Sequence, residues 1–198
     1  MYFQSLREAI AVFESLNDIA APLRAATEWC VAAFQSGGQI LICGNGGSAA
    51  EAQHLAGELV GRYKRERPAL PAVALTADSA ILTCIGNDYR FEDIFARQIH
   101  ALGRPGDILV VFTTSGNSPS VLNALIAGRE RGLKSIAFLG RDGGKARDLS
   151  DGVLLVRHAD TARVQEGHQF LMHCLMDGIE DVLSPQAGTR ELSDLDCN

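Results

Sequence analysis

The sequence lacks several features that define large classes of protein. No apolar run reaches the roughly 18 residues that a membrane-spanning helix needs, and no signal-peptide pattern opens the chain. No Gly-Lys-Ser/Thr occurs, and no C-x-x-C spacing joins any of its five cysteines. These absences exclude a Walker nucleotide loop and disfavour a disulfide framework. We therefore expect a cytoplasmic protein with reduced thiols and no membrane partner.

Positive charge is also scarce, because 18 Lys and Arg residues are set against 24 Asp and Glu residues, a formal net charge of −6. A chain with this balance has no electrostatic reason to bind nucleic acid. Hydrophobic residues make up 46% of the chain, an ordinary globular composition. A length of 198 residues is enough to bury one core, and we expect one domain over residues 1–198. The expected partners are small molecules and other subunits.

Hydrophobic periodicity divides the chain into three parts. Leu6 to Phe34 shows apolar residues at spacings of three and four, which predicts two amphipathic helices with a break at Asn17-Asp18. We interpret residues 1–36 as an N-terminal helical arm, 37–184 as an α/β core and 185–198 as a polar tail.

Within the core, short aliphatic runs alternate with helical patterns. Such an order indicates a parallel sheet covered on both faces, so we predict a doubly wound α/β sandwich with five strands. The expected strands are Gln39–Cys43, Ala72–Thr76, Ile108–Phe112, Ser135–Leu139 and Val153–Val156. The expected helices are Ser48–Arg62, Asp78–Ile85, Phe91–Leu102, Ser118–Arg131 and Thr161–Leu183.

Two small, hydroxyl-rich loops follow the first and third expected strands. They are Gly44-Asn45-Gly46-Gly47-Ser48 and Thr113-Thr114-Ser115-Gly116-Asn117-Ser118. Glycine lets the backbone approach a ligand closely, and free N–H groups at a helix start attract an anion. Ligands of such sheets bind beyond the carboxyl ends of the strands, where both loops belong. The loops therefore predict a phosphorylated, hydroxylated ligand, although the first is also compatible with an ordinary tight turn that has Ser48 as N-cap. We expect Asn87-Asp88, in the turn after a helix, to reach the same edge.

Side chains able to perform chemistry lie on two expected helices. His54 and Glu58 are four residues apart, so they share a helix face and can grip one ion or one substrate atom, and Arg62 continues that face. The alternative for this set is a solvated polar stripe or an intrahelical ion pair. Gln165 and His173 lie on the last helix, where the apolar surroundings of His173 are more often those of a buried core histidine than of a ligand.

Six sequence blocks stand out in this order along the chain: GNGGSAAEAQHLAGELVGR (44–62), RPALPAVAL (67–75), GNDY (86–89), TTSGNS (113–118), GRDGG (140–144) and VQEGH (164–168). Together these blocks resemble the phosphoheptose isomerase family, whose members carry a sugar isomerase (SIS) domain. The resemblance spans about residues 39–183, and it implies conversion of sedoheptulose 7-phosphate to D-glycero-D-manno-heptose 7-phosphate through an enediol, for cell-surface heptose synthesis.

The resemblance also implies a site in each subunit of a homotetramer, at the subunit interfaces. Glu58 and His173 correspond to the groups that transfer protons. The resemblance implies one zinc ion per subunit, and the residues that match its ligands are His54, Glu58, Gln165 and His173. The implied substrate contacts are Asn45, Gly46, Gly47, Ser48, Glu58, Arg62, Asn87, Asp88, Thr113, Thr114, Ser115, Ser118 and Gln165.

Two non-enzymatic alternatives share this fold. One is the tetrameric SIS protein that binds the replication initiator DnaA, which has lost the groups at the positions of Glu58 and His173. The other is a sugar-phosphate sensor, which needs only the phosphate loops. This chain keeps both Glu58 and His173, which favours the enzyme.

Overall fold

The computed structural model describes residues 2–184. Its strands are β1 (Ile40–Gly44), β2 (Ala72–Ala74), β3 (Ile108–Thr113), β4 (Lys134–Gly140) and β5 (Gly152–Val156). All pair in parallel, in the order β2-β1-β3-β4-β5. The predicted doubly wound, five-stranded parallel sheet is therefore confirmed. The predicted polar tail, residues 185–198, lies outside the described residues.

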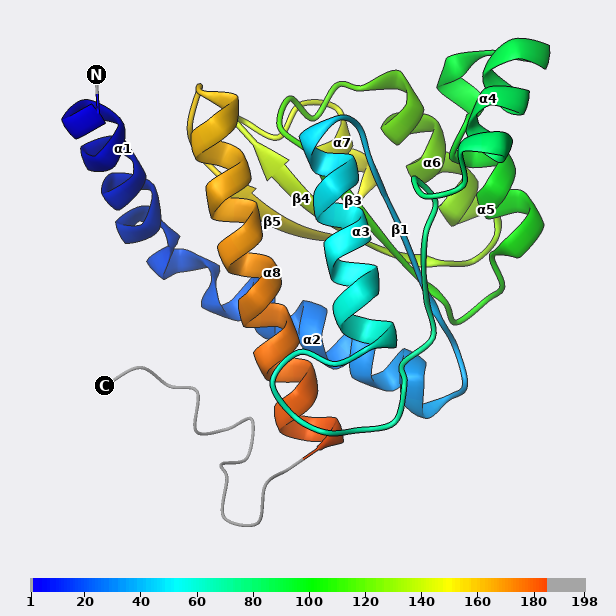
Figure 1. Cartoon of the computed structure of the whole chain (residues 1–198), viewed down its shortest axis with the longest axis horizontal. Coiled ribbons are helices and arrows are strands. Elements are labelled where there is room, and N and C mark those ends of the chain that lie inside the picture. Colours follow the sequence, from blue (N-terminus) through cyan, green and yellow to red (C-terminus); the bar gives the residue numbers. More distant parts are fainter. Residues whose placement is uncertain (1, 185–198) are drawn as a thin grey trace.

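Helices cover both faces of this sheet (Figure 1). One face carries α1 (Tyr2–Glu14), the 3₁₀ turn η1 (Ser15–Ile19), α2 (Ala20–Gln35), α3 (Gly47–Val60) and α8 (Thr161–Leu183). The other face carries α4 (Ser79–Asp88), the 3₁₀ turn η2 (Phe91–Asp93), α5 (Ala96–Leu102), α6 (Pro119–Glu130) and α7 (Ala146–Leu149). Between residues 2 and 184, no helix is long and apolar enough to cross a bilayer.

The central strands are buried on both sides because their residues alternate between two cores. In β1, Ile40 and Ile42 pack toward α3 and α8, whereas Leu41 and Cys43 pack toward α5 and α6. This explains why each strand is a continuous apolar run rather than an alternating one.

The connections change direction between β1 and β3. The chain leaves β1 for β2 on one side, whereas β3 pairs with β1 on the other. Gly44 at the end of β1 is in register with Phe112 near the end of β3. The loops after these two strands therefore open at the same point of the sheet edge, where open α/β sheets bind ligands.

Three expected helix boundaries were wrong. The helix α3 ends at Val60 because Gly61 leaves the helical conformation, with ψ of −106°, so Arg62 does not continue the face of His54 and Glu58. The helix α4 continues to Asp88, which places Asn87 and Asp88 in its last turn rather than after it. Gly86 and Asn87 are weak helix formers, which favoured the earlier end.

The third difference concerns the expected helix Phe91–Leu102, which is interrupted between η2 and α5. The adjacent residues Ile94 and Phe95 at the interruption are both almost fully buried. Successive residues of one helix point about 100° apart, so an irregular turn lets both side chains reach the same core.

The segment that follows α3 is held against α8 by the carboxylate of Glu180, which is 1% exposed. This carboxylate accepts backbone hydrogen bonds from Tyr63 (3.1 Å), Lys64 (3.0 Å) and Arg65 (2.9 Å). It also accepts one from Nε of Arg67, at 3.1 Å. Burial raises the pKa of Glu180, but the three backbone donors and the Arg67 charge outweigh burial and hold the pKa below its ordinary value. All four donors depend on the ionised carboxylate.

Replacing Glu180 with Gln is expected to lower the free energy of unfolding by about 3 kcal/mol, because a buried partner is removed from Arg67 and an amide cannot accept every donor. The folded pKa is depressed, so the stabilisation is complete above the unfolded value of about 4.3 and is lost as pH falls through the folded pKa. Urea unfolding of both proteins from pH 7 to pH 3 measures this difference.

The neighbouring Asp181 provides the control, because its side chain is 29% exposed and pairs with Arg65. Asp181→Asn is expected to cost no more than about 1 kcal/mol. The assigned role of Glu180 is contradicted if both variants lose the same free energy of unfolding. It is also contradicted if the loss caused by Glu180→Gln does not become smaller at low pH.

Candidate active site

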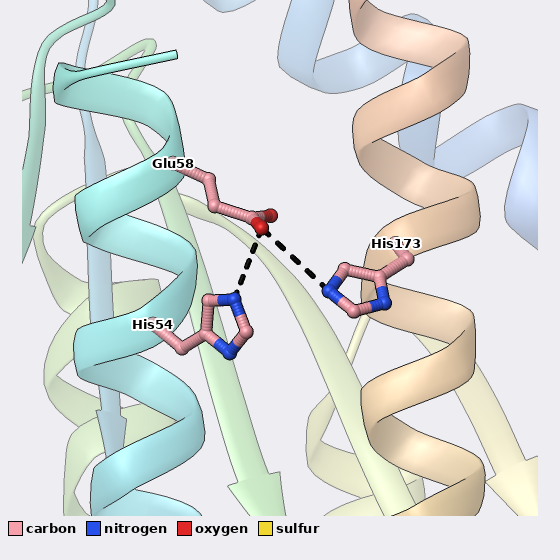
Figure 2. A group of neighbouring side chains, drawn as sticks. All are labelled: His54, Glu58 and His173. Atoms are coloured by element: carbon pink, nitrogen blue, oxygen red, sulfur yellow. Dashed lines mark hydrogen bonds and ion pairs between the residues drawn. The ribbon is translucent and has the colours of Figure 1, made fainter. Parts of the chain in front are cut away.

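Two helices bring three ionisable side chains together (Figure 2). Glu58 Oε1 lies 3.0 Å from His54 Nε2 on the same helix, α3, and 3.6 Å from His173 Nε2 on α8. The Glu58 side chain is only 14% exposed, whereas the His54 and His173 side chains are 44% and 35% exposed. The intrahelical pair considered for His54 and Glu58 is therefore present. The interpretation of His173 as a buried core residue was wrong, because its ring lies in the cleft between the helices.

The donor set of this triad fits a divalent cation. One ligand atom from each of His54, Glu58 and His173 can be chosen so that all lie within 4.8 Å of one another. Two imidazoles and one carboxylate are ligands that zinc accepts readily. The carboxylate, which is only 14% exposed, also brings negative charge to the site, which favours a cation there.

Aromatic packing fixes the orientation of His173. The Tyr63 ring stacks on it with centroids 5.4 Å apart and 14° between the planes. His54 meets the same ring edge-on, at 5.3 Å and 74°. Tyr63 belongs to the segment that Glu180 holds against α8. The hydrogen bonds of Glu180 therefore also support the position of His173 in the triad.

The two predicted anion loops are linked by direct hydrogen bonds. Asn45 Nδ2 donates to Ser118 Oγ at 2.8 Å and to Ser120 Oγ at 2.9 Å. The loop after β1 is therefore fixed to the start of α6, and the N-termini of α3 and α6 lie next to each other. Gly46 has φ of 58°, which favours glycine. The alternative with Ser48 as N-cap was wrong, since Gly46 is the N-cap of α3 and Ser48 is buried.

Some hydroxyls of the second loop maintain its own shape. Thr113 Oγ1 accepts a hydrogen bond from Gly116 N at 3.2 Å, and Ser115 Oγ accepts one from Asn117 N at 3.2 Å. Thr114 and Ser115 are partly exposed at the loop tip. This loop combines hydroxyls, backbone N–H groups and an adjacent helix start, which is a suitable environment for a phosphate.

A cleft of about 500 Å³ extends from the first loop to the triad. Its lining includes Gly47 at the loop, Gln165 and Gln169 on α8, and His173 at the triad. The Gln165 amide lies against Gly47, since a Cβ added to that glycine would be 2.2 Å from Gln165 Nε2. This position suits a substrate contact. Among the described residues no contact joins Gln165 to the triad, so its metal role stays a prediction.

Other predicted site residues lie apart from the cleft. Arg62 is exposed beyond the end of α3. Asn87 and Asp88 are exposed on α4, where Asn87 Nδ2 donates to Asp88 Oδ1 at 2.8 Å. Within residues 2–184 no hydrogen bond joins them to either anion loop, and their substrate roles stay predictions.

The structure adds residues that were not predicted for the site. Gln169 bonds to both histidines of the triad, and its four-residue spacing from His173 was a signal available in the sequence. Glu51 lines the cleft and lies 3.8 Å from the fully buried His168. Their carboxylate oxygens and ring nitrogens have no hydrogen-bond partner. No periodicity distinguishes this buried pair from core residues.

Comparison with known proteins places the chain in a family. A model of the SIS domain matches residues 1–140. Phosphoheptose isomerase of Aromatoleum aromaticum is 50% identical over 86% of this chain and 87% of its own length. That of Geobacter sulfurreducens is 50% identical over 91% of this chain and 96% of its own. The chain belongs to the SIS-domain phosphoheptose isomerase family.

Solved structures of phosphoheptose isomerases share its fold. GmhA from Neisseria gonorrhoeae gives a TM-score of 0.86 at 43% identity, covering 91% of this chain and 97% of that one. The enzyme from Francisella tularensis gives 0.83 at 39% identity, covering 91% and 95%. The similarity thus covers most of the chain.

In this phosphoheptose isomerase family member, two glycines of α3 provide a test of the contact between Gln165 and the first loop. Gly57→Ala is expected to raise the free energy of unfolding by about 1 kcal/mol, the usual gain in helix propensity, because its Cβ would meet nothing within 4 Å. Gly47→Ala is expected to gain less and to displace the Gln165 amide. Urea unfolding and the NMR signal of that amide measure both effects. If both variants gain the same free energy of unfolding and the Gln165 signal does not move, the Gln165 amide does not pack against Gly47.

Proposed function

We propose that the chain is a phosphoheptose isomerase that converts sedoheptulose 7-phosphate to D-glycero-D-manno-heptose 7-phosphate, for cell-surface heptose synthesis. The observation that carries this proposal is the approach of Glu58 and His173, 3.6 Å apart, at the end of a cleft that begins at the first anion loop. The names of its relatives support the same reaction. No observation on the chain favours a tetramer that binds DnaA.

Isomerisation of a ketose to an aldose moves a proton between adjacent carbons through an enediol, so it needs one base for carbon and one acid–base group for oxygen. Glu58 Oε1 faces both imidazoles, whereas Oε2 is buried and has no hydrogen-bond partner. We assign the transfer of the carbon-bound proton to the Glu58 carboxylate. His173 exchanges protons with the substrate oxygens.

His54 supports Glu58 in this scheme. In this structure its Nε2 lies 3.0 Å from Glu58 Oε1, so the imidazole and the carboxylate lie side by side. We propose one zinc ion per subunit, held by His54, Glu58 and His173, with Gln165 as the predicted fourth ligand. Such an ion supplies positive charge that polarises a carbonyl and stabilises negative charge on oxygen.

The anion loops hold the phosphate end of the substrate in the proposed complex. Asn45, Gly46, Gly47 and Ser48 surround the N-terminus of α3, where the helix dipole favours a dianion. Thr114 and Ser115 add hydroxyls from the neighbouring loop, with Thr113 and Ser118 holding that loop in place. The sugar chain then extends along the cleft toward the triad.

We further propose a homotetramer in which subunit contacts complete the sites. The exposed residues Phe3, Leu6, Ile10 and Phe13 recur on α1 at helical spacing and form an apolar stripe that this chain leaves uncovered. Phe13 packs edge-on against Phe170, and both line the cleft. A second copy on this stripe would therefore close one side of the site. A cytoplasmic location is supported by the four described cysteines, which are all free.

If this loop binds the phosphate, one substitution of Ser115 weakens substrate binding moderately and another abolishes it. Ser115→Ala removes a hydroxyl and is expected to weaken binding of sedoheptulose 7-phosphate about tenfold. Ser115→Asp places negative charge beside the dianion and is expected to abolish measurable binding. Calorimetry with the phosphorylated and the dephosphorylated sugar measures this. Similar affinity of the wild-type protein for both sugars contradicts phosphate recognition by this loop.

The proposed chemistry predicts that Glu58→Gln lowers kcat for sedoheptulose 7-phosphate by roughly 100- to 10,000-fold, the scale of a lost general base, while substrate affinity changes little. His173→Asn is expected to act similarly. A coupled assay measures the rates, and circular dichroism checks the fold.

Glu130 offers a matched control, because it makes a Glu–His contact of the same 3.6 Å length, with His100, on the exposed surface. Glu130→Gln is expected to leave kcat unchanged. A wild-type chain that does not isomerise the sugar phosphate, or a fully active Glu58→Gln variant, would overturn the proposed function.

A further inference from the structure

A second cavity opens at the carboxyl edge of the sheet, beside β4 and β5. Its volume is about 640 Å³, and its lining residues are Arg141, Asp142, Arg157, His158 and Ala159. Gly140 and Val156 are in register at the ends of the two strands, so Arg141 and Arg157 directly follow neighbouring strand ends. None of these lining residues belongs to the cleft between α3 and α8. The GRDGG block (140–144), which has no part in the proposed isomerisation, contributes two of them.

The backbone of Arg141 has an unusual conformation. Its φ of 59° lies in the left-handed region, whereas the other positive-φ positions of residues 2–184 are all glycines. A side chain in this region costs free energy that glycine would not. Such positions are found preferentially at functional sites. An arginine at this point of the turn therefore indicates a use for its side chain.

The turn that carries Arg141 is packed on the second anion loop. Ala146 N donates to Gly116 O at 2.9 Å, and Lys145 N donates to Asn117 Oδ1 at 3.2 Å. A Cβ added to Gly116 would lie 1.9 Å from the backbone oxygen of Gly143. These contacts hold the turn in one conformation, so Arg141 begins from a fixed point of the sheet edge.

Two guanidinium groups give the cavity positive charge. Arg141 and Arg157 are exposed, and within residues 2–184 neither guanidinium has a hydrogen-bond or ion-pair partner. The lining also contains the Asp142 carboxylate, whose Oδ1 accepts a hydrogen bond from Gly144 N at 3.1 Å. The two positive charges outweigh this one negative charge, in a chain whose formal net charge is −6.

The partly buried ring of His158 adds a donor to the lining. Its Nδ1 accepts a hydrogen bond from Asp160 N at 3.1 Å. A neutral ring with this bond carries its proton on Nε2. Nε2 is then a hydrogen-bond donor, as both guanidinium groups are.

We propose that this cavity is a second anion site, which binds a phosphorylated small molecule through its phosphate group. A guanidinium presents its donors in a planar fork that matches phosphate oxygens, and two such groups balance the charge of a dianion. The volume of about 640 Å³ lies within the range of roughly 300–1,000 Å³ that is typical of small-molecule sites. The inference does not depend on the proposed isomerase function, because that function uses none of the lining residues.

Titration of the full-length chain with inorganic phosphate, followed by backbone amide NMR, tests this site. The titration uses the Ser115→Asp variant, whose added negative charge blocks the proposed substrate-phosphate site. Ser115 does not line the second cavity. Phosphate is expected to shift the amide signals of residues 140–144 and 157–159, and the shifts are expected to saturate.

Two further substitutions in that background test the arginines. Arg141→Asn and Arg157→Gln are each expected to weaken phosphate binding about tenfold, because each removes a charged hydrogen-bond donor. Asparagine tolerates the left-handed conformation at position 141. Arg157 lies outside the turn, so Arg157→Gln keeps the test decisive if the first variant does not fold.

The matched control is Arg104→Gln, which removes the same charge from a cavity at the opposite edge of the sheet, next to Asp107. Arg104 is also exposed, and its substitution is expected to leave phosphate affinity unchanged. An equal loss of affinity in Arg104→Gln, or no saturable shift in the two segments, would overturn the second site even in an active isomerase. The expected shifts and variant effects in a chain without isomerase activity would uphold it while the proposed function fails.

Discussion

The geometry of the site depends on the hydrogen bonds that the Glu180 carboxylate accepts from the segment after α3. The same segment presents Arg67, whose Nη2 donates to the backbone oxygen of Glu58 at 2.6 Å, and Tyr63, which stacks on His173. Glu180 lies two turns beyond His173 on α8. This buried carboxylate therefore acts together with the shared apolar core of α3 and α8 to fix the two helices, and the triad depends on that relative position.

The sheet explains why the proposed phosphate site and the proposed acid–base site lie next to each other. The change of direction between β1 and β3 places two glycine- and hydroxyl-containing loops side by side, and Asn45 bonds them together. The helix α3 starts at the first loop and carries His54 and Glu58 on its later turns. In the proposed complex, α3 offers its N-terminus to the phosphate and its side chains to the reacting carbons, while α8 supplies the partner groups.

Much of this arrangement was predictable because it depends on local patterns. Apolar runs and helical periods gave the five strands, and the spacing of His54 and Glu58 gave their shared face. The failures arose where local preference and tertiary contacts differ. Gly61 ends α3 before Arg62, and α4 retains Asn87 and Asp88. The contacts of Glu180 and Gln169 join segments more than 100 residues apart, and such pairings leave no periodic signal.

The central claim is that the Glu58 carboxylate moves a carbon-bound proton of a sugar phosphate. Solvent deuterium incorporation tests it most directly, with sedoheptulose 7-phosphate in D₂O and mass spectrometry of the recovered sugars. The account predicts deuterium on the carbon next to the carbonyl with the wild-type chain, and none when an amide replaces the Glu58 carboxylate. Incorporation at the wild-type rate without that carboxylate would contradict it.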